Sequence, residues 1–427
     1  MRLLPTSRRR GLAPRRASTL ATSLIVLGLL GMACNPGAPA VSPPTDPLGV
    51  VTIPAGEKMH IAFWGVITGA DASLGIDSRR GVELAIADRG GKLLGHDVLL
   101  TSEDGGCTPE GGATAAAKMA ADNTIVGLIG SICSDETVGG IAALTAAGQT
   151  TISPSNTRPA LTFPERDASF AGYLRTAHSD AFQGKAVAEF VYNELGLRTM
   201  ATIHDGSAYG QALQQVAVDN FVALGGTVTA QEAVQKLQTD MSTVLTTVAA
   251  SNANAAPEVL YFPIFTAEGG AIAAQVRDVA GMEDVVLIGS DGLLSGDFVA
   301  AAGPNAEGMY LSSPDFSKFP AGYAGFLTKY QAAYGEKPIQ IFHAHAYDAA
   351  NILMNAIEKV AVRSGDIVYV PRKALRDAIY ATTNFAGITG TLSCGASGDC
   401  GAPVIAVYEV TAREVGGEWP PEAPIWP

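Results

Sequence analysis

Residues 125–137 read IVGLIGSICSDET, and residues 151–157 read TISPSNT. Each stretch begins with a short apolar run and ends in small residues that carry hydroxyl groups. An open α/β sheet places its ligand site just beyond the carboxyl ends of its strands, where such residues can reach it. The two stretches therefore predict neighbouring parallel strands that end at a site for a small polar molecule.

Short apolar runs alternate with Ala-rich segments of helical period over most of the chain, which predicts βαβ units around parallel sheets. The first series has strands at 60–66, 98–102, 125–129 and 151–153, and helices at 80–89, 113–121 and 136–147. A second series has helices at 181–195, 210–224, 241–250 and 267–280, and strands at 200–204, 227–230, 259–263 and 285–288. A tail adds helices at 321–334, 345–362 and 372–380 and strands at 387–392 and 404–410. Two series in sequence predict an α/β protein with two Rossmann-like lobes.

The N-terminal segment has the pattern of a secretory signal. Six arginines precede an apolar run at 20–32 that is short for a membrane span. Ala33 and Cys34 follow, and this resembles a bacterial lipoprotein signal, although Gly31 stands where Leu is usual. We therefore expect a signal peptide at 1–33 and lipidation of Cys34. The arginine pairs leave both Sec and twin-arginine export open.

Residues 34–57 contain six prolines, and such density predicts an extended linker behind the lipidated cysteine. Removal of 1–33 leaves 22 basic side chains against 41 acidic ones, a net charge of −19. A surface this acidic is a poor partner for nucleic acid.

Four cysteines remain after Cys34, and an exported protein can pair them in three ways. Their grouping along the chain favours Cys107 with Cys133 and Cys394 with Cys400. A zinc site is the alternative, but no Cys-x-x-Cys pair or histidine partner stands at ligand spacing. His343 and His345 are two positions apart at a helix start, where their side chains diverge. We expect no metal and no cofactor.

The turn after residue 129 carries Ser131, Ser134 and Thr137 at a helix start, where unpaired backbone N–H groups can bind an anion such as a ligand carboxylate. Ordinary N-capping by Ser134 is the alternative interpretation. The turn after residue 153 carries Ser155, Asn156 and Thr157, and a plain polar turn is the alternative there.

Three residues follow strand ends in the second series: Tyr209, Phe265 and Asp291. An aromatic ring beside a carboxylate can hold an ammonium group through ion pairing and cation–π contact. A turn aspartate and packed aromatic rings would explain the same residues without a ligand.

Several motifs stand in the order of one known family: Gly65 to Gly69, Gly81 to Ala85, Glu103 to Pro109, Ile152 to Pro154 and His204 to Gly210. From about Lys58 to Glu409 the chain resembles periplasmic binding proteins of the branched-chain amino-acid type, the substrate-binding components of ABC importers. The family's first-lobe disulfide matches Cys107 and Cys133.

The resemblance implies lobes at 58–179 with 315–405 and at 180–314 with 406–427. Three crossings near Ser179, Pro314 and Ile405 would form the hinge.

The resemblance also implies roles for single residues. Ser134 and Thr157 match the family's donors to the ligand α-carboxylate, assisted by the backbone at Ser155, and Tyr209 matches an aromatic that closes over the ligand. Phe265 stands where leucine-type members have Tyr, and Asp291 stands where they have Glu for the α-ammonium. Leu74 falls at a pocket-lining position.

The sequence has no Gly-x-Ser-x-Gly elbow, His-Glu-x-x-His pair or phosphate loop, so we expect that the protein is not an enzyme. The expected function is capture of an amino acid or similar small polar solute by closure of two lobes, for import through an ABC permease. The expected form is a monomer in the periplasm or on the outer face of the cell membrane, anchored through Cys34. A sensory module that reports to a membrane receptor and a binder of amide- or urea-type solutes are the alternatives.

Overall fold

The structure is a computed structural model that describes residues 42–421 and 423–427. The predicted signal peptide and the predicted lipidation site Cys34 lie outside the described residues. Among those described, no helix has the length and apolar character that crossing a membrane requires.

The first lobe is built on a six-stranded sheet with the order β3-β4-β2-β5-β6-β7, in which all strands but β3 run parallel. The strands are β2 (Met59–Gly65), β3 (Lys92–Leu93), β4 (His96–Asp104), β5 (Ile125–Gly130), β6 (Thr151–Ser153) and β7 (Tyr173–Arg175). Its helices are α1 (Ala72–Asp88), α2 (Pro109–Ala121), α3 (Ser134–Ala146), α9 (Gly322–Tyr334), α10 (His343–Val360) and α11 (Arg372–Tyr380).

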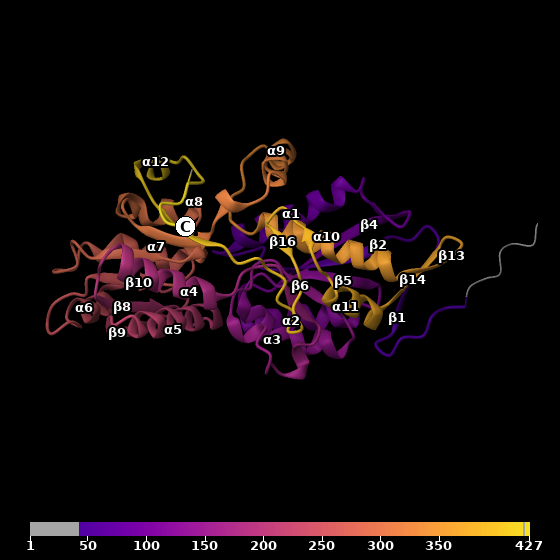
Figure 1. Ribbon diagram of the computed structural model, residues 1–427, viewed down its shortest axis with the longest axis horizontal. Coiled ribbons are helices and arrows are strands. Elements are labelled where there is room, and N and C mark those ends of the chain that lie inside the picture. Colours follow the sequence, from indigo (N-terminus) through magenta and orange to yellow (C-terminus); the bar gives the residue numbers. More distant parts are fainter. Residues whose placement is uncertain (1–41, 422) are drawn as a thin grey trace, which may run out of the picture. The chain divides into compact units, whose positions relative to one another are not determined.

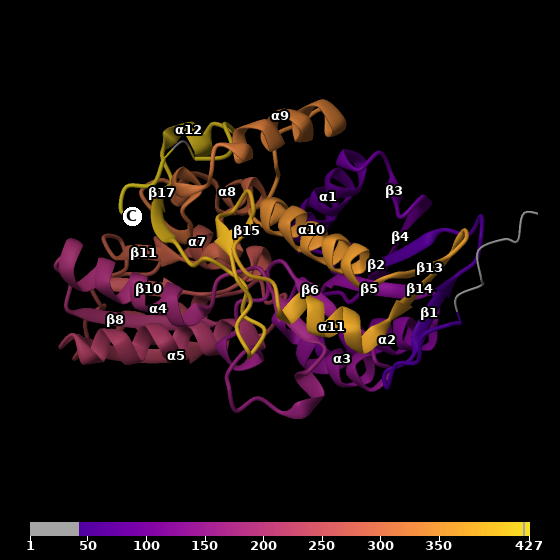
Figure 2. The same ribbon diagram turned by 45° about the vertical axis from the view of Figure 1, so that its right-hand side comes forward.

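Every residue of β2 is buried because helices cover both faces of this sheet (Figure 1). Side chains alternate along a strand, so Ala62 and Trp64 join a core with α2 and α3 while Ile61 and Phe63 join the core on the other face. On that other face α1 and α10 lie side by side (Figure 2). Gly81 permits this close approach, since a Cβ there would lie 2.1 Å from the carbonyl oxygen of His343.

The second lobe is built on a sheet with the order β17-β12-β11-β10-β8-β9, in which only β17 is antiparallel. Its strands are β8 (Thr199–His204), β9 (Thr227–Ala233), β10 (Val259–Phe262), β11 (Val286–Gly289), β12 (Tyr310–Pro314) and β17 (Ile405–Glu409). Its helices are α4 (Asp180–Glu189), α5 (Ala208–Ala223), α6 (Ser242–Ala249), α7 (Thr266–Val276), α8 (Gly296–Ala302) and α12 (Ala412–Val415). The predicted α/β class with two parallel-sheet lobes is confirmed.

The chain passes between the sheets after β7, after β12 and before β17. Two of these segments are hydrogen-bonded together, because the backbone N–H of Asp315 donates to the carbonyl of Val404 at 2.9 Å. The predicted lobe boundaries at 179/180, 314/315 and 405/406 stay predictions.

A third, small sheet was absent from the prediction. Residues 50–53, within the stretch expected to be linker, form β1 (Val50–Ile53), which pairs antiparallel with β14 (Ile367–Pro371) beside β13 (Val362–Ser364). Val51 and Ile53 are buried there, since alternate residues of β1 face the first lobe. The strand expected at 387–392 is instead a hairpin of β15 (Phe385–Ala386) and β16 (Thr391–Leu392).

Both preferred disulfides are present, with Cα–Cα distances of 5.2 Å for Cys107–Cys133 and 3.8 Å for Cys394–Cys400.

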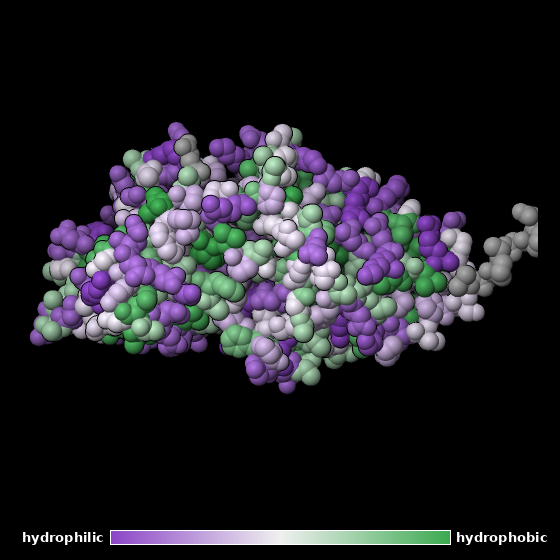
Figure 3. Space-filling model, viewed as in Figure 1, coloured by the Kyte–Doolittle hydropathy of each residue, from purple (hydrophilic) through white to green (hydrophobic). Residues whose placement is uncertain are grey.

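On the face drawn in Figure 3, hydrophobic residues form small separate groups among hydrophilic ones.

Candidate functional site

The turn between β5 and α3 is held by the buried carboxylate of Glu136. Its Oε2 accepts hydrogen bonds from the backbone N–H groups of Ile132 and Cys133, each at 3.0 Å, and its Oε1 accepts from the N–H of Cys107 at 3.1 Å. Burial raises the pKa of Glu136 to about 7, and the N–H bonds oppose that rise. Since Glu136 holds the turn from behind, Ser134 at the start of α3 lines the open side.

The turn after β6 is tied directly to this first turn. The hydroxyl of Ser153 donates to the carbonyl of Ser131 at 2.7 Å, and the hydroxyl of Ser155 donates to the carbonyl of Ile132. These bonds fix Thr157 beside Ser134 at the carboxyl edge of the first sheet, where both line one cavity.

Asn156 does not point into that cavity. Its Nδ2 donates to the hydroxyls of Ser131, at 3.0 Å, and Thr137, at 2.6 Å, inside the first lobe. Asn156 and Thr137 therefore lie inside the first lobe, behind the two turns. Asn156 is the one predicted ligand residue that does not line the cavity.

The opposite wall comes from the second lobe. The Asp205-Gly206-Ser207 turn ends β8, with Gly206 at a φ of 78°, and the Ser207 hydroxyl caps α5 by accepting from the N–H of Gly210 at 2.9 Å. This cap places Tyr209 in the first turn of α5.

Tyr209 joins the other two predicted residues of this wall. Its hydroxyl donates to Asp291 Oδ1 at 2.5 Å, and its ring centroid lies 5.2 Å from that of Phe265. Gln183 Nε2 donates to the same Oδ1 at 2.9 Å. Among the described residues nothing is hydrogen-bonded to Asp291 Oδ2, which leaves an acceptor for a ligand cation.

These residues enclose a small cavity between the two lobes. Seven of the eight predicted ligand residues line it. The lining residues are Leu74, Ile132, Cys133, Ser134, Ser155, Thr157, Tyr209, Phe265, Asp291, Gly292 and Phe342. The sequence prediction missed Ile132, Cys133, Gly292 and Phe342, although Cys133 and Gly292 are direct neighbours of the predicted residues Ser134 and Asp291.

Asp180 is a second buried carboxylate near this wall that the sequence prediction did not include. It is fully buried, and neither of its carboxylate oxygens has a hydrogen-bond partner among the described residues. Burial and the neighbouring Asp291 raise its pKa well above the usual value, while the Thr157 hydroxyl opposes the rise. Its position at the start of α4 after Ser179 was the only sequence signal available.

The lobes are closed on each other in this structure. Both carboxylate oxygens of Asp135 in α3 accept from the backbone N–H of Ala208 in α5, at 3.1 and 3.0 Å. Lys236 of the second lobe donates to the carbonyl of Cys107 at 2.8 Å and lies 3.7 Å from Asp71. Burial raises the pKa values of both Asp71 and Asp135.

Both ring nitrogens of His343 lie within hydrogen-bond distance of other side chains of the protein. Its Nδ1 lies 2.8 Å from Asp77 Oδ2, and its Nε2 lies 2.8 Å from the Tyr323 hydroxyl. No cluster of three or more potential metal-ligating side chains is found in the described part of the chain.

Comparison with known proteins supplies a family match. Residues 58–413 match the family model described as periplasmic binding protein. The chain is 28% identical over 347 residues to the Leu/Ile/Val-binding protein homolog 3 of Brucella melitensis, which covers 80% of this chain and 89% of that protein. It is 26% identical over 358 residues to a leucine-, isoleucine-, valine-, threonine- and alanine-binding protein of Pseudomonas aeruginosa, covering 83% and 90% of the two chains.

Solved structures give the same fold. The leucine-binding protein LivK of Thermotoga maritima aligns with a TM-score of 0.73 at 23% identity, over 83% of this chain and 96% of that one. LivJ of Streptococcus pneumoniae, solved with isoleucine, aligns with a TM-score of 0.72 at 23% identity and the same coverage.

Proposed function

Because the chain belongs to the periplasmic binding protein family, we propose that it captures an amino acid in the cavity between its lobes. The observation that carries the proposal is that one wall of the cavity offers hydrogen-bond donors and the opposite wall offers a carboxylate. Ser134 and Thr157 offer hydroxyl donors from the first lobe, and Asp291 offers a carboxylate from the second. A zwitterion with an α-carboxylate and an α-ammonium complements the two walls.

Closure would retain the ligand. Residues from both lobes line the cavity, and the Asp135 and Lys236 contacts hold the lobes together around it. A ligand that touches both lobes binds the closed form better and shifts the population toward it. The closed form would be the one that an ABC permease recognises.

The side-chain end of the cavity is apolar, since Leu74, Ile132, Phe265 and Phe342 line it. This favours an amino acid with an aliphatic side chain over a charged one. The Pseudomonas relative, by its name, binds leucine, isoleucine, valine, threonine and alanine, and the Brucella relative is named a homolog of a Leu/Ile/Val-binding protein.

The protein would work outside the cytoplasm as a monomer. The Arg-rich export signal would be removed, and a lipid on Cys34 would anchor the mature chain to a membrane. A sensory role in the same compartment uses the same binding step. Co-purification with a permease, as opposed to a receptor ectodomain, separates the two roles.

Isothermal titration with amino acids, amides, urea and short organic acids tests the ligand. We expect one aliphatic amino acid to bind with a stoichiometry of one per chain and to raise the unfolding temperature. Absence of heat and of thermal shift for every amino acid contradicts the proposal, and binding of urea or an amide alone supports the alternative solute class.

A further inference from the structure

A second cavity lies next to the candidate site, and residues close together in the sequence line the two cavities. Phe342 lines the candidate site, whereas its neighbours Ile341 and His343 line the second cavity. Likewise, Gly292 lines the first and Leu294 the second. The second cavity is larger than the first and opens to solvent.

One side of this cavity is a set of flat aromatic faces. The rings of Phe316, Tyr323 and His343 are nearly parallel, with interplanar angles of 11–14° and centroids 5.8–6.4 Å apart. Tyr408, Trp419, Leu294 and Leu327 also belong to the apolar lining. Tyr323 and His343 are also joined by a hydrogen bond of 2.8 Å, so these neighbouring rings form a flat surface on which a planar aromatic ring can stack.

Gln340, which lines the same cavity, carries an unpaired polar atom. The side chain is only 5% exposed, and its Nε2 donates to the hydroxyl of Ser73 at 3.2 Å. Its Oε1 is buried and has no hydrogen-bond partner among the described residues. Buried carbonyl oxygens are normally paired, so this oxygen points to a ligand that brings an O–H or N–H donor.

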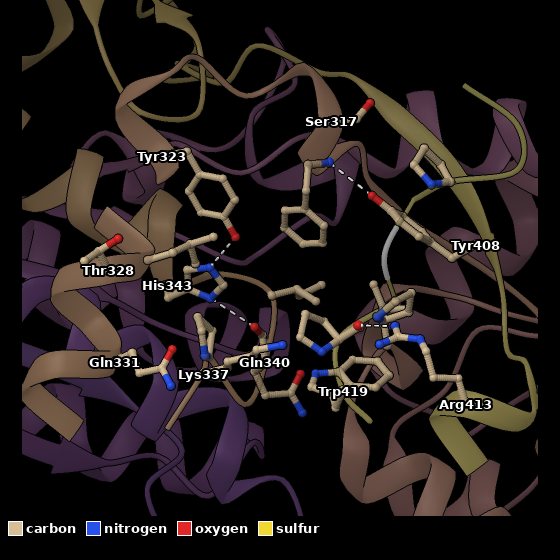
Figure 4. Close-up of a pocket in the computed structure, with 18 residues that line it drawn as sticks. Ser317, Tyr323, Thr328, Gln331, Lys337, Gln340, His343, Tyr408, Arg413 and Trp419 are labelled. Carbon is tan, nitrogen blue, oxygen red and sulfur yellow. Dashed lines mark hydrogen bonds between the residues drawn. The ribbon is translucent and has the colours of Figure 1, made fainter. Parts of the chain in front are cut away.

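The charge of the lining favours an anion. It contains Lys337 and Arg413 but no acidic residue, in a chain with 41 acidic side chains. Arg413 is engaged with Glu414 and Glu418, whereas the Lys337 ammonium has no partner among the described residues. Lys337 lies on the same side of the cavity as Gln340, across from Tyr323 and Ser317 (Figure 4).

We propose that this second cavity binds a small aromatic carboxylate that carries a hydroxyl or amino group. Its ring packs against the aromatic faces, its carboxylate pairs with Lys337, and its O–H or N–H donates to Gln340 Oε1. The site is separate from the amino-acid site and does not depend on the identity of that ligand.

The probe is 4-hydroxybenzoate, titrated calorimetrically into the full-length protein. We expect one molecule to bind per chain, and we expect the Gln340→Leu and Lys337→Gln variants each to weaken binding at least about tenfold. Leu327→Trp, which places a larger side chain in the cavity, should weaken binding as well. Lys359→Gln, at an exposed position of α10, is the matched control and leaves the affinity unchanged.

Unchanged thermal unfolding in each variant shows that the fold is intact. Binding of 4-hydroxybenzoate that is lost in Asp291→Asn but retained in Gln340→Leu places the probe in the first cavity and overturns the proposal. Absence of heat with the wild-type protein overturns it as well.

Discussion

The carboxylate of Asp135 accepts the backbone N–H of Ala208 at both of its oxygens, at 3.1 and 3.0 Å. Asp135 lies in the first turn of α3 and Ala208 is the first residue of α5, so this contact joins the two lobes. A carboxylate at a helix N-terminus also interacts favourably with the helix dipole. The contact therefore stabilises the closed arrangement and is absent once the lobes separate.

Replacement of Asp135 by Asn should weaken the closed form by about 1–2 kcal/mol, because a charged acceptor at the α5 N-terminus becomes neutral. Ligand affinity is expected to fall about 5- to 30-fold, mainly through faster dissociation. Stopped-flow fluorescence with the amino acid identified by titration measures this rate. Asp219→Asn, exposed on α5, is the control and should leave it unchanged. Equal dissociation rates in wild type and Asp135→Asn would show that the contact does not hold the lobes together.

Asp291→Asn tests the proposed ammonium acceptor. The change retains the shape of the side chain and removes its charge, and it should weaken amino-acid binding by roughly 2–4 kcal/mol because the buried ammonium loses its counterion. Calorimetric titration gives the affinity. Asp297→Asn, exposed in α8, is the control and should bind like wild type. Unchanged affinity in Asp291→Asn would place the ammonium elsewhere.

The sequence predicted the helices and strands of the two lobes because local periodicity and turn residues specify them. Strand β6 at 151–153 and helix α11 at 372–380 are found as predicted. Strand β1 could not be predicted, since it is four residues long and its partner β14 is more than 300 residues away. Pairing at that distance leaves no local signal.

The candidate site shows the same limit at the scale of single side chains. Position in a turn predicted that Ser134 and Thr157 would line the cavity, but it did not predict the direction of the Asn156 amide. That direction follows from the hydroxyls of Ser131 and Thr137, which pair with Asn156 inside the lobe. Asp180 was missed because its proximity to Asp291 exists only after the lobes fold.

The Cys107–Cys133 disulfide should contribute both to stability and to binding. In the loop-entropy model, closing a separation of 26 residues contributes about 3–4 kcal/mol to the free energy of unfolding. The Cys107→Ser/Cys133→Ser double variant should lose that stability and also bind ligand less tightly, because Cys133 lines the cavity. Urea unfolding and titration measure the two effects. The Cys394→Ser/Cys400→Ser variant is the comparison and should lose about 2 kcal/mol with unchanged affinity. Equal losses of affinity in both double variants would contradict this prediction.

Glu136 gives the protein a pH-dependent stability of a specific sign. Burial raises the folded-state pKa of Glu136 to about 7 from its ordinary value of 4.5. Between these two values the folded protein holds a proton that the unfolded chain has lost. The free energy of unfolding therefore falls as pH rises through this window, by about 3 kcal/mol at most from this group.

Glu136→Gln removes that titration, because an amide does not ionise. The variant is less stable than wild type at pH 4.5, since an amide has one acceptor oxygen for the three N–H groups that Glu136 binds. The deficit should shrink as pH rises from 4.5 to 7, because only wild type loses stability through Glu136 in this window. Urea unfolding at half-unit intervals of pH measures the difference. Glu110→Gln, exposed in the first turn of α2, is the control. Its free energy of unfolding should differ from that of wild type by the same amount at every pH. A deficit that stays constant from pH 4.5 to 7 would mean that Glu136 does not titrate in this range.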